Sequence, residues 1–345
     1  MKIGIAQDHQ VPASVRFYRT MGPVSFLEKQ YPGLFQVDFR PAQYFAGHEM
    51  HVFPYDIMLI ERPITGTALQ IVRLCKSQGV ITWVDYDDNL FQIPAYNKSR
   101  NYFSQSSNFK TVQQIMSEAD LVTVSTQALK NIYAGLNKNV RVIPNTWNSF
   151  RFPLPESYSD AGTPIRMAWR GGDKHSGDLN DVRVPFQNAV NDPAFDWRLF
   201  GDRPEPHITI KDNQHIGFML LFPYLKTLIQ SSFDYLFVPL QANEFNKGKS
   251  NCSWIEATFA GAVTIAPMGF PEFDQPGVIR YKDNKHLKII FDGIKKGKYD
   301  KRERVEASRT ALMEKYHLGL ANELRKNLLL EFFPVVEKVE ADGTS

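Results

Sequence analysis

Apolar runs of strand length alternate with helix-patterned segments along almost the whole of this 345-residue chain. The strand-like runs are KIGIAQ, DIMLIE, VITWVDY, LVTVS and VRVIP in the first part, and IRMAWR, DWRLFG, DYLFVPL, AVTIAP and GVIRY in the second. Continuous apolar strands separated by helices indicate parallel sheets that helices cover on both faces. The pattern therefore predicts an α/β fold built from doubly wound, Rossmann-like units.

A polar segment divides this pattern into two parts. The residues NTWNSFRFPLPESYSDAGTP, at 145–164, are rich in Asn, Ser, Pro and Gly, which is typical of a linker. The chain is also too long for one ordinary core and suits two domains of common size. We predict two domains that face each other across a cleft, over 1–150 and 151–320, and a C-terminal helix within 321–345 that packs back across their junction.

Composition limits the environment and the partners of the chain. No stretch approaches the roughly 20 apolar residues that a membrane span requires. MKIGIAQ leads directly into a strand pattern without the features of a signal peptide, so we expect a cytoplasmic protein. Cys75 and Cys252 match neither a metal site nor a disulfide framework, and we expect both to be reduced. The net charge of +3 permits an anionic partner without requiring one.

Polar residues directly after the strands are the candidate ligand-binding groups, because doubly wound sheets bind ligands at the carboxyl ends of their strands. FNKGKSNCSWIEATFAGAVTIAP follows the strand DYLFVPL. Within it, Ser250 or Asn251 is placed to cap a helix that runs to Ala260 and that Gly261 ends. A helix N-terminus offers free N–H groups and partial positive charge, so together with Lys249 it is a candidate diphosphate site.

Two further features extend this candidate site. Glu256 lies almost two turns into the predicted helix, where its carboxylate could accept hydrogen bonds from ribose hydroxyls. The loop RGGDKHSGDL follows the strand IRMAWR; Arg170 can bind phosphate oxygens with two N–H donors, and Gly171 and Gly172 let backbone approach a ligand. A solvated loop, a surface glutamate and an ordinary glycine turn fit the same spacing. The occurrence of both loops in one domain favours a nucleotide site.

These two segments together resemble the nucleotide-sugar-dependent glycosyltransferases of the GT-B fold, particularly the large retaining family. VRVIPNTW resembles the family's hinge, WVDYDDNLFQIP resembles an Asp-rich segment of bacterial and phage members, and the resemblance runs from about Met1 to Pro267. It implies a nucleoside diphosphate sugar, most simply a UDP-sugar, as the donor. It implies no metal ion and no other cofactor. The implied contacts are the ribose with Glu256, and the diphosphate with Arg170, Gly172, Lys249 and Ser250.

The sequence departs from the family pattern at one position. The family usually carries a glutamate eight residues before the ribose glutamate, and this chain has Gly248 there. That first glutamate typically contacts the donor sugar, so the sugar, hexose or pentose, and the stereochemical course stay open. We expect the sugar contact to come from Asn243, Glu244 or Asn246. The difference also keeps open a catalytically silent protein that binds a nucleotide sugar or nucleic acid.

Polar residues after the first-domain strands are the candidate catalytic and acceptor-binding groups. His9 matches loosely, by position, the family's histidine that contacts the donor sugar; a surface histidine is the alternative. In DYDDNL an aspartate could orient or deprotonate an acceptor hydroxyl, or it could cap a helix. We predict that His9 and Asp88 are catalytic. The predicted acceptor-binding residues are Asp8, Arg16, Arg62, Asp85, Lys98 and Arg100.

One loop bears on the acceptor. QIPAYNKSRNYFSQSSNFK interleaves aromatic with basic residues, which suits backbone phosphates and unstacked bases, and RYKDNKHLKIIFDGIKKGKYDKRER adds a second basic tract. Solvated surfaces fit both tracts equally well. SWIEATFAGAVTIAP resembles phage-encoded members, so we predict a hydroxymethylated base of phage DNA as the acceptor, modified in the host cytoplasm. A cell-surface saccharide or a lipid-linked acceptor is the alternative. The oligomeric state is left open.

Overall fold

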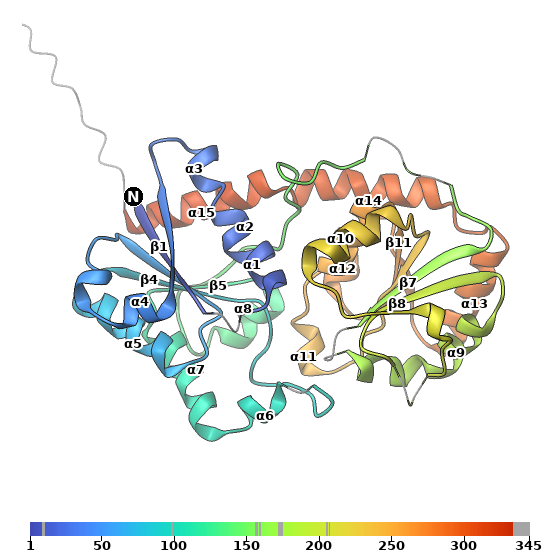
Figure 1. Cartoon of the computed structure of the whole chain (residues 1–345), viewed down its shortest axis with the longest axis horizontal. Helices are drawn as coiled ribbons and strands as arrows, with labels where there is room; N and C mark the ends of the chain where they lie inside the picture. Colours follow the sequence, from blue (N-terminus) through green and yellow to red (C-terminus); the bar gives the residue numbers. More distant parts are fainter. Residues whose placement is uncertain are drawn as a thin grey trace, which may run out of the picture.

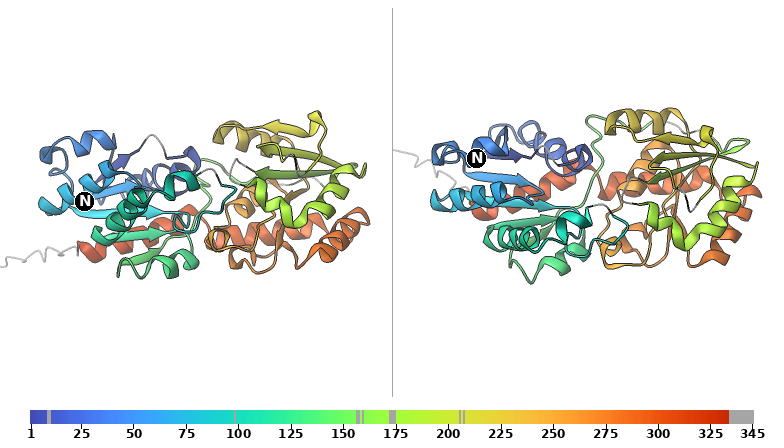
Figure 2. Two further views of the ribbon diagram at one scale, coloured as in Figure 1. Left: turned by 90° about the horizontal axis from the view of Figure 1, so that it is seen from below. Right: turned by 60° about the horizontal axis from the view of Figure 1, so that its bottom comes forward.

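The computed structural model of the chain describes residues 1–8, 11–97, 99–155, 158, 160–171, 175–204, 206 and 208–333. Two α/β domains lie side by side, each built on a six-stranded sheet (Figure 1). Neighbouring strands in both sheets run parallel. Helices cover both faces of each sheet, as Figure 2 shows. The predicted α/β class with two doubly wound units is therefore confirmed.

The first sheet has the order β2-β1-β3-β4-β5-β6. Its central strands β3 and β4 are almost completely buried, because helices cover both of their faces. The bounds are β1 (Lys2–Gln7), β2 (Gln36–Pro41), β3 (Ile57–Glu61), β4 (Ile81–Tyr86), β5 (Leu121–Val124) and β6 (Val140–Val142).

The second sheet has the order β12-β11-β10-β7-β8-β9. Strands β10 and β11 are wholly buried at its centre. The bounds are β7 (Ile165–Gly171), β8 (Phe195–Gly201), β9 (His215–Gly217), β10 (Tyr235–Phe237), β11 (Val263–Pro267) and β12 (Ile279–Tyr281).

The helices of the first domain connect its strands in chain order. They are α1 (Ala13–Arg19), α2 (Met21–Val24), α3 (Leu27–Gln30), α4 (Ala42–Ala46), η1 (Glu49–His51), α5 (Gly66–Ser77), α6 (Arg100–Phe103), α7 (Ser106–Glu118) and α8 (Gln127–Tyr133).

The helices of the second domain likewise connect its strands in chain order. The last two, α14 and α15, lie across the junction between the domains. They are η2 (Ser176–Val182), α9 (Arg183–Asn191), η3 (Asp212–Gln214), α10 (Leu221–Gln230), α11 (Glu244–Lys247), α12 (Cys252–Ala260), η4 (Pro271–Phe273), α13 (Asn284–Lys295), α14 (Lys301–Lys315) and α15 (Leu318–Phe332).

Each strand that the sequence predicted is present, but strands β2 and β9 were not predicted. Strand β2 lies at the sheet edge and has no fully buried residue, so it lacks an apolar run. Strand β9 is also an edge strand, and its three residues are all only partly buried. A short or half-exposed edge strand gives too weak a pattern to be recognised.

The C-terminal helix α15 crosses from the second domain to the first. Helix α14 packs against α12, whereas α15 packs against α2 and α3. The Asn322 side chain of α15 donates a hydrogen bond to the Pro23 carbonyl oxygen over 3.1 Å. Figure 1 shows the two helices running one after the other along both domains.

The two chain segments that connect the domains are bonded to each other. The Trp147 amide donates to the Tyr316 carbonyl oxygen over 2.8 Å, and the Leu318 amide donates to the Trp147 carbonyl oxygen over 3.1 Å. The Trp147 side chain is fully buried and packs against Phe259 of α12, with ring centroids 3.7 Å apart. The junction is therefore a packed joint between the domains.

A buried ion pair ties α1 to the first sheet and to the start of the linker. The Arg19 guanidinium donates to both Asp85 carboxylate oxygens, over 2.9 Å and 2.7 Å, and neither side chain is more than 3% exposed. It also donates to the Ile143 carbonyl oxygen and to Asn145 Oδ1. Thr123 donates a further hydrogen bond to Asp85. A buried charge pair is retained only when its hydrogen bonds are met, and here they are.

Replacing Arg19 with Leu tests this pair. The change leaves the Asp85 charge buried without its partner, so we expect the free energy of unfolding to fall by about 3–5 kcal/mol. Urea unfolding of the variant measures the loss. The matched control is Arg73→Leu, which removes a two-pronged but exposed pair with Glu118 and should cost far less. Equal losses in the two variants would show that burial adds nothing to the Arg19 pair.

Candidate functional site

The loops at the carboxyl ends of the two sheets meet between the domains. Asn89, after β4, donates a hydrogen bond to the Glu244 carbonyl oxygen of the second domain over 3.1 Å. Thr126, after β5, donates to the Gly248 carbonyl oxygen over 3.3 Å. These are the edges where doubly wound sheets bind ligands, so the predicted site residues of both domains are gathered in one region.

The predicted loop and helix around Lys249 are present with small differences. Helix α12 spans Cys252–Ala260, and Gly261 ends it in the left-handed conformation, at φ 74°. Asn251 is the N-cap residue, but its side chain caps no backbone N–H group. The α12 N-terminus directly follows Lys249 and Ser250, as the sequence predicted.

Gly248 stands where the resembled family carries its first glutamate. A Cβ atom at this position would lie 2.8 Å from Cδ2 of Leu129, on α8 of the first domain. A larger side chain here would therefore have to displace Leu129. Gly248 therefore lies directly against a side chain of the first domain.

Lys249 is ion-paired across the domain boundary. Its Nζ lies 2.6 Å from Asp88 Oδ1, and Asp88 Oδ2 accepts a hydrogen bond from Arg62 Nη2 over 2.9 Å. The Arg62 guanidinium also lies 3.6 Å from Asp87. The Asp88 carboxylate is thus held between one cation of each domain.

Glu256 has no exposed surface, and three side chains bind its carboxylate. Arg170 Nη1 donates to Oε1 and Oε2 over 3.1 Å and 3.0 Å. Tyr224 of α10 donates to Oε2 over 2.9 Å, and Tyr18 of α1 donates to Oε1 over 3.0 Å. Tyr18 thus brings a first-domain side chain into contact with Glu256, the residue predicted to bind the ribose.

Ser250 is bonded to the start of the interdomain linker. Asn145 Nδ2 donates to Ser250 Oγ over 2.8 Å and lies 3.0 Å from Cys252 Sγ. The amide oxygen of the same Asn145 accepts a hydrogen bond from Arg19. The buried Arg19–Asp85 pair is therefore connected through one side chain to the α12 N-terminus.

Asp178 collects hydrogen bonds from several loops of the site. It is buried, and Oδ1 accepts from Tyr96, from the Gln241 amide and from Asn246 over 3.0, 3.1 and 2.7 Å. Asp178 Oδ2 lies 2.8 Å from His175 Nδ1. Tyr96 belongs to the first domain, so this aspartate also joins the domains.

The residues predicted to contact the donor sugar differ in accessibility. Asn246 is 1% exposed, and its amide nitrogen donates to Asp178 and to the Gln241 carbonyl oxygen, so that nitrogen is committed to the loop. Asn243 is the N-cap of α11 and donates to the Tyr96 hydroxyl over 3.3 Å. Glu244 is exposed and is paired with Lys247. The structure thus leaves Asn243 and Glu244 as the more accessible of the three.

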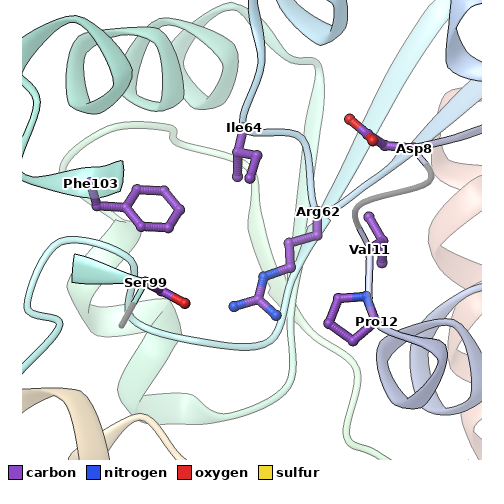
Figure 3. A pocket seen from close by; sticks show the side chains of 7 residues that line it. All are labelled: Asp8, Val11, Pro12, Arg62, Ile64, Ser99 and Phe103. Atoms are coloured by element: carbon purple, nitrogen blue, oxygen red, sulfur yellow. The ribbon is translucent and has the colours of Figure 1, made fainter. Parts of the chain in front are cut away.

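A pocket opens in the first domain at the carboxyl ends of β1 and β3 (Figure 3). Arg62 points to its centre, and the pocket is lined by Asp8, Val11, Pro12, Arg62, Ile64, Ser99 and Phe103. Arg62 has φ +37°, a left-handed conformation that is rare for a residue other than glycine. A strained backbone conformation persists only where the surrounding structure holds it in place, and such residues cluster at functional sites. Two predicted acceptor-binding residues, Asp8 and Arg62, therefore line one pocket.

The other predicted first-domain residues have different surroundings. Asp85 does not reach the pocket, because it lies within β4, buried and bonded to Arg19; this corrects the expectation that it binds the acceptor. Arg16 is paired with Glu61 over 3.2 Å, with a quarter of its side chain exposed. Arg100 is exposed at the start of α6. His9, Lys98 and Gly172 lie outside the described residues.

Burial shifts several titratable groups near these loops. Burial raises the pKa of Asp87 above its ordinary value; Arg62 opposes the rise and Asp88 adds to it. Burial lowers the pKa of His175, although its bond to Asp178 acts in the opposite direction. The lowered pKa favours the neutral imidazole. Burial also raises the pKa of Glu272, in η4 after β11, to about 7.

The described part of the chain shows neither a metal site nor a membrane-spanning helix. Those residues contain no group of three or more His, Cys, Asp or Glu side chains able to hold a metal ion. Among them, no helix has both the length and the apolar character needed to cross a bilayer. Cys75 and Cys252 are both free.

Four residues that organise this region were not predicted from the sequence. Tyr18, Tyr224, Asp178 and Asn145 each bond to a predicted site residue, yet none was singled out. Tyr18 lies 238 positions from Glu256, so no local pattern could pair them. The only signal was positional: Tyr18 sits on the helix that follows the first strand.

Comparisons with known proteins place the fold. No protein-family model matches the chain, and no curated protein matches it in sequence. The structure of Anabaena HepE in complex with UDP-glucose is 12% identical and has a TM-score of 0.62, covering 96% of this chain and 99% of that one. The trehalose-6-phosphate synthase OtsA is 8% identical, with a TM-score of 0.59, covering 95% and 99%.

A third structure agrees with these two. The UDP-forming α,α-trehalose-phosphate synthase of Burkholderia xenovorans, solved with glucose-6-phosphate, is 10% identical with a TM-score of 0.56, covering 91% of this chain and 84% of that one. Likeness over nearly the whole chain, together with two parallel-sheet domains, shows that this protein has the GT-B fold, as the sequence predicted.

The partly buried Glu272 makes the free energy of unfolding depend on pH. Its pKa of about 7 lies above the ordinary value of 4.5, so the folded protein binds this proton more tightly than the unfolded chain does. The contribution of Glu272 to the free energy of unfolding is therefore complete below about pH 4.5. It is lost as the pH rises to about 7, which lowers the free energy of unfolding by up to about 3 kcal/mol.

Glu272→Gln tests this prediction. The difference in the free energy of unfolding, wild type minus variant, should fall between pH 4.5 and 7 and then stay level. Urea unfolding at several pH values measures it. The control Glu244→Gln, at an exposed glutamate, should leave the pH profile unchanged. A Glu272→Gln profile parallel to that of wild type would contradict the assignment.

Proposed function

We propose that this protein transfers a sugar from a nucleoside diphosphate sugar to an acceptor hydroxyl. The observation that carries the proposal is the convergence of Arg170, Lys249 and the α12 N-terminus at the carboxyl edge of the second sheet, facing the first domain. Cations beside a helix N-terminus suit a diphosphate. The similar structures support the same class, since they include complexes of HepE with UDP-glucose and with UDP, and a UDP-forming synthase.

The donor diphosphate is proposed to lie between Arg170 and Lys249, with Ser250 beside it. A third of the Arg170 side chain is exposed, so its guanidinium can reach a ligand while Nη1 holds Glu256. These cations would stabilise the charge that develops on the leaving diphosphate. We propose that transfer therefore needs no metal ion. Glu256 is proposed to bind the ribose, and Asn243 or Glu244 the sugar.

The acceptor is proposed to bind in the first-domain pocket around Arg62. There the acceptor oxygen forms a bond to the anomeric carbon of the sugar while the bond from that carbon to the diphosphate breaks. Among the residues that the structure describes, Asp88 is the candidate general base that accepts the proton of the acceptor hydroxyl. It lies between Arg62 in the pocket and Lys249 at the donor site. Positioning of the two substrates would supply much of the rate enhancement.

Lys249→Ala and Arg170→Ala test the donor site. Each change removes a charge-assisted contact of about 1.5–3 kcal/mol, so each should weaken UDP binding by about one to two orders of magnitude. Calorimetry on the full chain measures this. The control is Lys247→Ala, an exposed lysine two positions away that is paired with Glu244 and should bind UDP like wild type. Unchanged affinity in both test variants would contradict the donor site.

DNA is the acceptor that we propose. Arg100 lies on α6, whose residue Phe103 lines the acceptor pocket, and Lys110 is exposed on α7. Cations beside such a pocket suit backbone phosphates. Tyr96 donates to Asp178 at the domain junction, whereas Phe103 lines the pocket and the Tyr102 hydroxyl donates to the carbonyl oxygen of Ile64, another lining residue.

The acceptor is tested with labelled sugar nucleotides. Sugar should be transferred, in the presence of EDTA, to hydroxymethylated DNA and not to unmodified DNA. The affinity of wild type for DNA should fall steeply as the salt concentration rises. The double variant Arg100→Ala/Lys110→Ala loses two phosphate contacts, so its slope of log affinity against log salt concentration should be smaller by about two. Transfer to a saccharide or lipid-linked acceptor alone would replace DNA by that class. Donor binding without transfer to any of them would favour a silent binding protein.

A further inference from the structure

Three groups of the proposed donor site are each bonded to the first domain. Lys249 is paired with Asp88, Ser250 accepts a hydrogen bond from Asn145, and Glu256 accepts one from Tyr18. These first-domain partners come from separate elements: the loop after β4, the linker and α1. One contact of this kind could be incidental, but three converge on one proposed ligand site.

Two of these contacts match the chemistry of the proposed donor. At Lys249 the partner is a carboxylate, which, like a diphosphate, is an oxygen anion that accepts from an ammonium group. At Glu256 the partner is the hydroxyl of Tyr18, which, like a ribose hydroxyl, donates to a carboxylate. Asp88 and Tyr18 thus offer the donor-site groups the same kinds of bond that the donor would offer.

Burial keeps both substitutes in place. The Lys249 and Asp88 side chains are 18% and 13% exposed, so their attraction is only partly screened by solvent. Tyr18 packs with Phe17 in an apolar cluster whose other buried members are second-domain residues, among them Ala168 and Tyr224. Glu256 is fully buried, and the Tyr18 hydroxyl is one of three side-chain groups that bind its carboxylate.

We propose that Asp88 and Tyr18 compete with the donor for its binding groups, Asp88 occupying the place of the diphosphate at Lys249 and Tyr18 the place of a ribose hydroxyl at Glu256. The inference rests on the proposed function. Donor binding releases Asp88 from Lys249 while Arg62 still holds it beside the acceptor pocket. The competition thereby couples donor binding to the presentation of the proposed base.

The test is UDP binding by the full chain, measured by calorimetry on wild type, Asp88→Asn and Tyr18→Phe. Asp88→Asn keeps the size of the side chain and removes the competing charge. Tyr18→Phe keeps the ring in its apolar cluster and removes the competing hydroxyl. Each variant should bind UDP about tenfold or more tightly, because the donor no longer displaces an internal partner. The matched control, Tyr55→Phe, removes a tyrosine–carboxylate bond to Asp38 within the first domain and should leave affinity unchanged.

The outcomes separate the inference from the proposed function. If wild type binds UDP and both variants bind it equally well or more weakly, the competition is ruled out. The proposed donor site is not contradicted by that result. A purely structural role for the two contacts gives that result, since it provides no route to tighter binding. If no form of the chain binds UDP, the proposed function fails and the inference fails with it. Tighter binding in both variants but not in Tyr55→Phe supports the inference.

Discussion

The Glu256 carboxylate has no exposed surface, and the arrangement of the site depends on how its charge is met. An isolated buried carboxylate is costly unless cations and hydrogen-bond donors compensate it. Arg170 from the end of β7, Tyr224 from α10 and Tyr18 from α1 supply that compensation. One side chain of α12 therefore fixes the ends of three other elements, and one of these belongs to the other domain.

The buried charges of the first domain extend this network. Arg19 satisfies Asp85 inside the sheet and reaches Asn145, which in turn bonds to Ser250. The interdomain linker thus begins at a residue that touches both the first-domain core and the α12 N-terminus. Trp147 is also bonded to the segment between α14 and α15. Buried polar contacts therefore hold the two domains in their relative position.

The fold could be predicted from the sequence because it depends on local patterns. Buried parallel strands such as β4 and β11 are continuous apolar runs, the linker is marked by its polar composition, and Gly261 marks the end of α12. The edge strands β2 and β9 lacked such a run and were missed. Local periodicity thus identified the architecture but not its margins.

The site could be predicted only in part. The loop position of Lys249 and Arg170 follows from the rule that ligands bind at the carboxyl ends of strands. Which polar residue is committed to a partner depends on distant contacts, so the burial of Asp85 with Arg19 and of Asn246 with Asp178 had no local signal. A sequence pattern can place a residue at the correct edge of a sheet, but only tertiary contacts decide whether its side chain faces a ligand.

A crystal structure of the protein with UDP would show whether the carboxyl edge of the second sheet binds a nucleoside diphosphate. We expect the diphosphate to contact Arg170 and Lys249 at the N-terminus of α12, with Asp88 no longer bonded to Lys249. UDP bound in the first-domain pocket around Arg62, or bound without contact to either Arg170 or Lys249, would contradict this expectation.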